Sequence, residues 1–322
     1  MIEEIVPDLF RIKIPLPQSP LKYLNSYVIR GAKRNLIIDT GLNRKECLHA
    51  MQEGLQELGV DLTNTDFFIT HLHADHFGLV AKLITDNSRI YFNRPEAELI
   101  ESWQGWEPMI TYAGQNGFPE DQLRAALQNH PGHKFASDWI PGLNILSDGD
   151  VIDAAHYQFR CIWTPGHTPG HICLYEPDRK ILVAGDHILN DITPNIQCWS
   201  DKTNPLKQYL ASLDKVFDLE VDLVLPGHRR IFQNYRERIE ELRSHHDIRV
   251  NEVRQILAKG PKTAYQLASE MAWDIECDSW ENFPVAQKWF ATGEAIAHAR
   301  YLEAQNAVTR KTRSRIIKYV LK

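Results

Sequence analysis

Several features that mark special classes of protein are scarce or absent in this sequence. The chain of 322 residues has five cysteines and no C-x-x-C pair, which argues against a disulfide framework and against a thiolate zinc knuckle. No run of about 18 apolar residues could cross a membrane, and prolines interrupt the N-terminal segment where a signal peptide needs its apolar stretch. We therefore expect a cytoplasmic protein in a reducing compartment, with no membrane partner.

An excess of positive charge is lacking as well. The formal net charge is −6 and the sequence pI is about 6.2, which gives no global electrostatic reason to bind nucleic acid or an anionic membrane. With 43% hydrophobic and 24% charged residues, the composition is that of an ordinary globular protein whose length allows two domains. The partner must therefore be inferred from local sites.

Up to about residue 232, short apolar runs end in turn-rich segments and alternate in places with helical stretches. This pattern predicts a mixed α/β domain over residues 1–234. The tetrapeptide "EPDR" at 176–179 separates two apolar runs and predicts a hairpin turn, so part of the sheet should be antiparallel. Strands are expected at 27–31, 35–41, 66–70, 89–93, 157–164, 171–176, 180–186 and 221–227.

Two regions have a helical pattern instead. Residues 94–145 carry several aromatic side chains and Gly- and Pro-containing loops, which predicts either a helical lid inserted over a substrate pocket or a helical layer whose aromatics fill the core. Residues 235–322 contain three helical segments and a basic tail with alternating apolar residues. We expect this second region to form a small winged-helix-like domain with a terminal β-ribbon.

The segment "THLHADH" at 70–76 follows an apolar run and concentrates potential metal ligands. Residues i and i+2 of a strand point to the same side, so His71 and His73 could bind one cation together. Asp75 and His76 lie beyond them, where the chain leaves the strand. These four imidazole and carboxylate groups exceed what a single tetrahedral ion needs from one short segment, which favours two adjacent metals.

Three further candidates occupy similar positions later in the chain. His167 in "TPGHTPGH", Asp186 in "LVAGDH" and His228 in "LVLPGH" each follow an apolar run. Pro and Gly before a histidine end the strand sharply and let the imidazole face the strand ends. The three residues could therefore complete the ligand set begun by "THLHADH".

The ordered motifs "IDTG", "THLHADH", "TPGHTPGH", "AGD" and "PGH" resemble the five motifs of the metallo-β-lactamase-fold hydrolases. The resemblance implies a four-layer αββα sandwich with metals at one edge between its two sheets. It implies one metal on His71, His73 and His167, and another on Asp75, His76 and His228, with Asp186 between them. Asp39 and His171 would orient these ligands rather than bind metal.

The chemistry implied by the resemblance is hydrolysis. Two divalent transition metals about 3.5 to 4 Å apart convert a bridging water to hydroxide near neutral pH and polarise the substrate oxygen. We expect zinc, with iron or manganese as alternatives. Asp75 would be both a metal ligand and the catalytic residue that orients the hydroxide and passes a proton to the leaving group.

The residues at two positions argue against other branches of this family. Asp186 stands where the best-known zinc β-lactamases have Cys, and His73 stands where flavodiiron proteins have Glu. The remaining resemblance is to glyoxalase-II-like thioesterases and to lactamase-like hydrolases with a C-terminal winged-helix domain. Because the chain is acidic and the predicted lid is aromatic, we expect hydrolysis of a small-molecule thioester or ester.

Two alternatives remain open. The same metal centre could cleave single-stranded RNA, which would need phosphate-binding cations near the cleft. The C-terminal domain could instead make the chain a nucleic-acid-binding regulator, through Lys311, Arg313, Arg315 and Lys318 on the predicted ribbon. A solvated ribbon packed against the active-site mouth or against a second subunit of a homodimer would explain the same charges.

Overall fold

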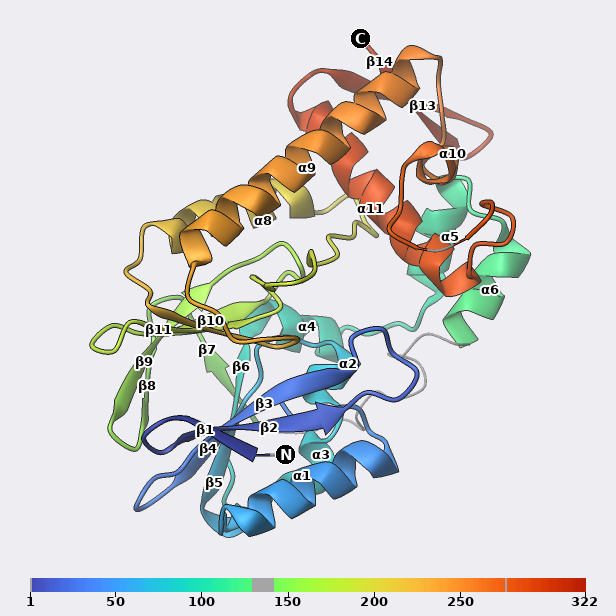
Figure 1. The fold of residues 1–322 in the computed structure, drawn as a ribbon. Coiled ribbons are helices and arrows are strands. Elements are labelled where there is room, and N and C mark those ends of the chain that lie inside the picture. The colour runs from blue at the N-terminus through green and yellow to red at the C-terminus, as the bar shows by residue number, and fades with distance from the viewer. Residues whose placement is uncertain (1, 129–141, 276) are drawn as a thin grey trace. The chain divides into compact units, whose positions relative to one another are not determined.

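The computed structural model describes residues 2–128, 142–275 and 277–322 (Figure 1). Residues 129–141 of the predicted lid lie outside this description. The chain divides into two compact units. Unit 1 comprises Met1–Ser102, Pro131–Pro194 and Ser212–Arg238, and unit 2 comprises Trp103–His130, Asn195–Ala211 and Ile239–Lys322.

Unit 1 is built on two sheets. Among the described residues, one sheet has seven strands in the order β1 to β7, in which β1 to β4 pair antiparallel and β4 to β7 pair parallel. Its strands are β1 (Ile2–Val6), β2 (Leu9–Pro15), β3 (Tyr23–Ile29), β4 (Asn35–Ile38), β5 (Thr65–Phe68), β6 (Ile90–Asn93) and β7 (Leu143–Leu146).

The second sheet has five strands among the described residues, in the order β12-β11-β10-β9-β8. The hairpin predicted at 176–179 is present, because β10 and β11 pair antiparallel with Glu176 opposite Ile181. The last pair, β11 and β12, is parallel. The strands are β8 (Val151–Ala154), β9 (Tyr157–Trp163), β10 (Ile172–Glu176), β11 (Ile181–Gly185) and β12 (Leu223–Pro226).

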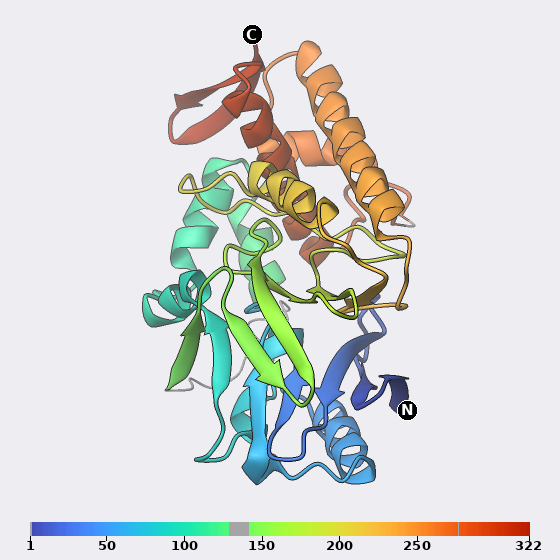
Figure 2. The same ribbon diagram turned by 90° about the vertical axis from the view of Figure 1, so that its left-hand side faces the viewer.

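Apolar side chains from both sheets form one buried cluster. Tyr27, Ile38 and Phe68 of the first sheet share this core with Phe159 and Leu174 of the second. Figure 2 shows the yellow-green strands of the second sheet in front of the blue strands of the first. Burial of this shared apolar surface stabilises the sandwich. The predicted α/β sandwich of two sheets is therefore confirmed.

Helices cover the other face of the seven-stranded sheet. Cys47, Met51 and Leu55 recur at helical spacing on α1 and pack with Ile12 and Phe67 of the sheet. A second cluster joins α2 to α4 with β6. These elements are α1 (Lys45–Glu57), the 3₁₀ turn η1 (Leu62–Asn64), α2 (Ala74–Phe77), α3 (Val80–Leu83) and α4 (Arg94–Glu101).

Unit 2 is mainly helical. Trp289 of α11 packs with Ile110 of α5 and Phe118. Thr263 is the N-cap of α10, and its hydroxyl accepts a hydrogen bond from the Gln266 amide. A C-terminal ribbon of β13 and β14 closes the chain. The elements are α5 (Glu107–Gln115), α6 (Glu120–Gln128), most of α9 (Tyr235–Ala258), α10 (Ala264–Glu270), α11 (Val285–Ala304), β13 (Val308–Arg313) and β14 (Ile316–Leu321).

The compact units divide the predicted lid. Helix α4 belongs to unit 1, whereas α5 and α6 group with the C-terminal helices, and α8 (Pro205–Phe217) contributes to both units. The domain assignment 1–234 and 235–322, the lid and the winged-helix description stay predictions. No helix in the described residues combines the length and apolar composition that a membrane crossing needs.

Candidate metal centre

The candidate ligands lie where strands of unit 1 end. His71 and His73 follow β5, Asp186 follows β11, and His228 follows β12. Because β11 and β12 are parallel, their carboxyl ends meet at one edge of the second sheet. His167 lies in the turn between β9 and β10. The fold thus brings side chains that are up to about 150 residues apart in sequence to one place.

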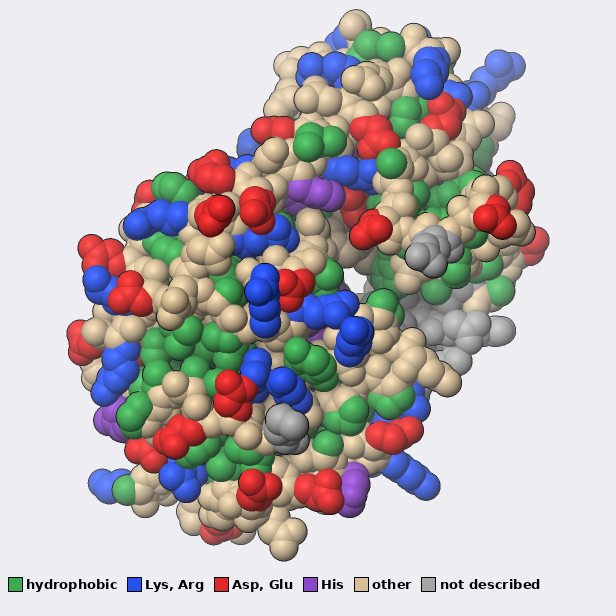
Figure 3. All heavy atoms as spheres, viewed as in Figure 1, with side chains coloured by type: hydrophobic (Ala, Val, Ile, Leu, Met, Phe, Trp, Pro, Cys, Tyr) green, Lys and Arg blue, Asp and Glu red, His purple; other side chains and the backbone are tan. Residues whose placement is uncertain are grey.

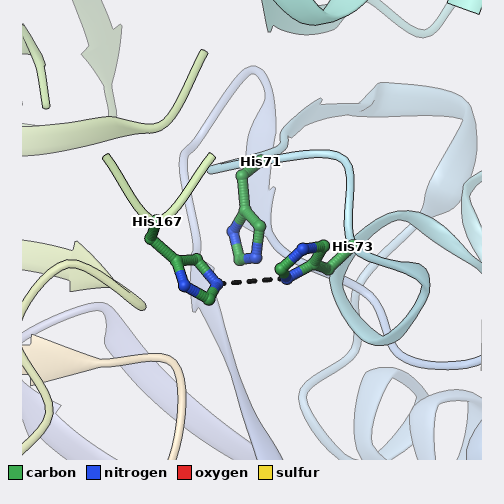
Figure 4. Close-up of side chains that lie close together, drawn as sticks. All are labelled: His71, His73 and His167. Carbon is green, nitrogen blue, oxygen red and sulfur yellow. Dashed lines mark hydrogen bonds between the residues drawn. The ribbon is translucent and has the colours of Figure 1, made fainter. Parts of the chain in front are cut away.

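All seven predicted ligands meet there, in three overlapping groups. Within each group, one potential ligand atom per residue lies within 4.8 Å of the others. Figure 4 shows the first group, in which the three imidazole rings face one another. The groups are His71, His73 and His167; His71, His76 and Asp186; and Asp75, His76 and His228.

Asp186 lies between the histidines. Its Oδ2 atom is 3.4 Å from His228 Nε2, 3.6 Å from His76 Nε2 and 3.7 Å from His167 Nε2. Asp75 also contacts His228, with its Oδ2 3.3 Å from His228 Nε2. One carboxylate therefore reaches both of the outer groups, as a bridging ligand must.

The protein holds the Nδ1 atoms of the buried ligands His76 and His228. His76 Nδ1 lies 2.7 Å from Asp39 Oδ2, and His228 Nδ1 lies 3.0 Å from the Tyr23 carbonyl oxygen. Both oxygens are acceptors, so these Nδ1 atoms carry the hydrogen and donate it. In the neutral rings, the lone pair is then on Nε2.

His71 reaches the same state through Thr70. The Thr70 hydroxyl donates its single hydrogen to Asp39 Oδ2 at 2.8 Å, so it accepts from His71 Nδ1 at 3.0 Å. The Thr70 amide also donates to Asp39 Oδ1 at 2.9 Å. Asp39 adopts a positive φ of 58°, which is uncommon outside glycine, and its carboxylate contacts both His76 and Thr70.

The donor set fits a metal cluster. His71 Nε2, His76 Nε2, His228 Nε2 and Asp186 Oδ1 are buried and have no hydrogen-bond partner among the described residues. Buried polar atoms without partners are costly, and here all of them belong to side chains that meet in the candidate ligand groups. Imidazole and carboxylate are ligands of zinc, iron and manganese, so bound cations would satisfy these atoms.

The buried carboxylates also favour positive charge. Burial opposes protonation of His228, but Asp186 and Asp75 outweigh it and raise its pKa to about 10. Burial likewise opposes the charged form of His76, yet Asp39 and Asp186 hold its pKa well above the usual range. The negative potential of these three carboxylates is the electrostatic setting that cations need.

His171 differs from the candidate ligands in the partners of its ring nitrogens. Its Nε2 accepts from the Asp186 amide at 3.1 Å, so its Nδ1 donates to Thr164 Oγ1 at 2.8 Å. Both ring nitrogens are therefore engaged within the protein. His171 orients the backbone of Asp186 and has no lone pair left for a metal.

Two glycines allow the close approach of these groups. A Cβ atom on Gly227 would lie 2.5 Å from Asp186 Oδ1 and 2.8 Å from His76 Cε1, and one on Gly185 would lie 2.6 Å from His171 Nε2. Gly185 also has a positive φ of 49°. The "PGH" motif thus needs glycine because a larger residue would displace the ligands Asp186 and His76, and the "AGD" motif needs it because a larger residue would displace His171, which orients Asp186.

Glu96 at the start of α4 is a residue that the sequence reasoning missed. Its side chain is fully buried, and its Oε1 accepts from the Gly170 amide at 3.2 Å. Gly170 belongs to the turn that carries His167, so Glu96 fixes that turn against α4. Burial raises the pKa of Glu96 to about 7. Its position within an ordinary helical pattern gave no signal of this contact.

The chain is similar in sequence and fold to several known proteins. A "Probable metallo-hydrolase YqjP" from Bacillus subtilis is 26% identical over 316 residues, 94% of each chain. The human acyl-coenzyme A thioesterase MBLAC2 is 27% identical over 65% of this chain and 74% of its own. A metallo-beta-lactamase family protein from Thermus thermophilus matches with a TM-score of 0.83 and 29% identity, over 99% of this chain and 100% of its own.

A family model covers the motifs themselves. The metallo-beta-lactamase superfamily model matches residues 21–228, which include every candidate ligand. The two-sheet core and the convergent His/Asp site agree with that match. The chain belongs to the metallo-beta-lactamase superfamily of hydrolases.

Proposed function

We propose that the chain is a binuclear metal-dependent hydrolase that cleaves a small-molecule thioester or ester. The observation that carries this proposal is the meeting of His71, His76 and His228 at Asp186, with each Nε2 atom buried and without a hydrogen-bond partner among the described residues. The similarity to the human acyl-coenzyme A thioesterase favours a thioester among the possible acyl substrates.

The ligand sets follow from the groups. His71, His73 and His167 would hold one metal, and Asp75, His76 and His228 would hold the other, with Asp186 shared between them. When bound, two such cations activate water near neutral pH and polarise the acyl carbonyl oxygen. We propose zinc in both positions, with iron or manganese as the alternatives.

The protein's own groups would orient the reaction. Asp39 and Tyr23 fix the His76 and His228 rings, so the ligands are set before substrate arrives. Asp75 has an 18% exposed side chain, the only partly open carboxylate of the ligand groups, and would accept a hydrogen bond from the attacking water. It would then pass a proton to the departing thiolate, giving a carboxylic acid and a free thiol.

A panel of acyl thioesters, acyl esters and single-stranded RNA, offered to metal-replete protein, tests the proposal. We expect free thiol to appear with at least one thioester, and the Asp186→Ala variant to release it about 10³-fold more slowly. Cleavage of RNA together with inactivity on every thioester and ester would replace this proposal by the endoribonuclease alternative.

A further inference from the structure

The C-terminal ribbon, defined as residues 308–322, has a charge unlike that of the rest of the chain. It contains six of the 36 Lys and Arg residues and none of the 42 Asp and Glu residues. In Figure 3, Lys and Arg side chains lie around the part of unit 2 where Figure 1 labels β13 and β14. A strongly basic segment in an acidic protein raises the question of what anion it meets.

The strand register sorts these cations onto one face. Lys311 pairs with Lys318, and Arg313 pairs with Ile316. The alternate residues Ile317 and Tyr319 are buried, so they mark the inward face of the ribbon. Because directly opposite residues share a face, Lys311, Lys318 and Arg313 all lie on the outward, exposed face.

The protein neutralises the inward cation but not the outward ones. Arg310, opposite Tyr319, forms ion pairs with Glu303 and Asp201. The cations of the outward face and of the turn are Lys311, Arg313, Arg315 and Lys318. Among the described residues, no carboxylate forms an ion pair with any of these four.

Two features of the ribbon act against its own stability. Lys311 and Lys318 are like charges in directly opposite positions, which disfavours strand pairing. The two-residue turn has positive φ at both Ser314 (49°) and Arg315 (67°), a type I′ geometry in which Asn-Gly is much preferred. An arginine forced into the left-handed region at the tip of a charged hairpin is the kind of strain found at functional positions.

We propose that the outward face of the C-terminal ribbon binds the phosphate backbone of duplex DNA. The four cations Lys311, Arg313, Arg315 and Lys318 would replace counterions of the DNA. The B-form major groove, about 12 Å wide, admits a two-stranded ribbon, whereas the major groove of duplex RNA is too narrow for side chains to read. The face exposes one large apolar side chain, Ile316 at 37%, too little to anchor in a membrane surface.

Salt dependence of binding to a fluorescent duplex of about 20 base pairs tests the proposal with the full chain. For four neutralised phosphates, log K should fall against log salt with a slope of about −3 to −4. The Lys311→Gln/Arg313→Gln/Lys318→Gln variant should bind at least 10-fold more weakly at about 20 mM salt, with a slope near about −1. The matched control Lys33→Gln/Lys45→Gln/Arg254→Gln loses three exposed cations elsewhere and should bind within about 2-fold of the wild type.

A turn variant separates a binding role from a structural one. Ser314→Asn/Arg315→Gly relaxes the type I′ turn, so we expect a higher Tm together with a salt slope reduced by about one. Asp186→Ala should bind the duplex like the wild type, because the ribbon acts independently of the metal centre. Equal binding by the ribbon triple variant and its control, or no binding at about 20 mM salt, would overturn the proposal. Tighter binding to single-stranded RNA or to phosphatidylserine vesicles than to duplex DNA would overturn it as well.

Discussion

Buried histidines occur in both compact units, but they use their ring nitrogens differently. In unit 2, His246 Nδ1 lies 3.2 Å from His298 Nε2, and His298 Nδ1 donates to the Glu294 carbonyl oxygen at 2.8 Å. This pair forms a hydrogen-bonded chain in which only His246 Nε2 has no partner among the described residues. In unit 1, His71, His76 and His228 each have such an Nε2 atom, and all three rings lie close to the Asp186 carboxylate.

This difference in the partners of the ring nitrogens distinguishes histidines that are simply buried in a core from histidines of a candidate binding site. Burying a histidine is common when its neighbours satisfy it, as in unit 2, and it then indicates nothing about ligands. The arrangement in unit 1 is different. Hydrogen-bond acceptors bind the Nδ1 atoms of His71, His76 and His228, so the protein holds each neutral ring in one tautomer and leaves its Nε2 atom available to a ligand. All groups of three or more potential ligands found among the described residues lie in unit 1.

Removal of the Asp186 carboxylate should have the largest effect on activity, whereas a change in the unit 2 histidine pair should have little. We expect Asp186→Ala to lower kcat/KM for the best thioester by about 10³-fold, since both metals would lose a ligand. His298→Gln, which disrupts the unit 2 pair, should leave kcat/KM within about 2-fold while lowering Tm. Steady-state kinetics on both metal-replete variants measures these changes in kcat/KM. Comparable losses in the two variants would contradict the distinction between the unit 1 site and the unit 2 histidine pair.

Asp39 should matter for metal affinity rather than for folding alone. Asp39→Asn removes the carboxylate that holds His76 and Thr70, so we expect metal affinity to fall by about 10- to 100-fold. Asp66→Asn is a matched control, because Asp66 is also buried in unit 1 but pairs with Arg34. Competition with a chelator measures both affinities. An Asp39→Asn affinity equal to that of Asp66→Asn would show that Asp39 only stabilises the fold.

A methyl group added at Gly227 should disturb the site. Because a Cβ there would lie 2.5 Å from Asp186 Oδ1, we expect Gly227→Ala to lower the free energy of unfolding by about 1 to 3 kcal/mol and to reduce bound metal. Gly114→Ala in α5 meets only Glu120 Cγ, at 4.0 Å, and should be neutral or stabilising by up to about 1 kcal/mol. Denaturant titration and elemental analysis test the pair, and equal stability with full metal content in Gly227→Ala would contradict the expected clash.

Glu294, which lies beside the buried histidine pair of unit 2, should make the stability of the protein depend on pH. Burial raises the pKa of Glu294 to about 7, from an ordinary value of 4.5, so the carboxyl binds a proton on folding between these pH values. Its contribution to stability is therefore present below pH 4.5 and is lost as the pH rises to about 7.

Glu294→Gln should remove the loss of stability that accompanies the rise in pH from 4.5 to about 7. We expect the free energy of unfolding of the variant to rise relative to the wild type by about 1 kcal/mol per pH unit within this window. Glu237→Gln, an exposed carboxylate of α9, is the control and should show no such trend. Urea titrations at several pH values measure the differences. A constant difference between Glu294→Gln and wild type would mean that Glu294 titrates normally in the fold.

The sequence was most informative where chemistry is concentrated in short motifs. "THLHADH" and the Pro-Gly-His turns identified side chains that the fold brings together, because strand ends impose where such residues can meet. The Thr70 relay between Asp39 and His71 and the buried contact of Glu96 with Gly170 were missed, since each depends on a tertiary approach between distant segments. Strands β1, β2, β7 and β8 were also missed, and β7 lies at the end of the 94–145 segment that was expected to be helical.

The number of metals held by the site tests the central claim most directly. Elemental analysis of the metal-replete wild type should give about two transition metals per chain, because the ligands form two outer groups around Asp186. His167→Ala and His228→Ala, which each remove a ligand from one group only, should retain about one metal. At most one metal in the wild type, with the same content in both variants, would contradict the binuclear account.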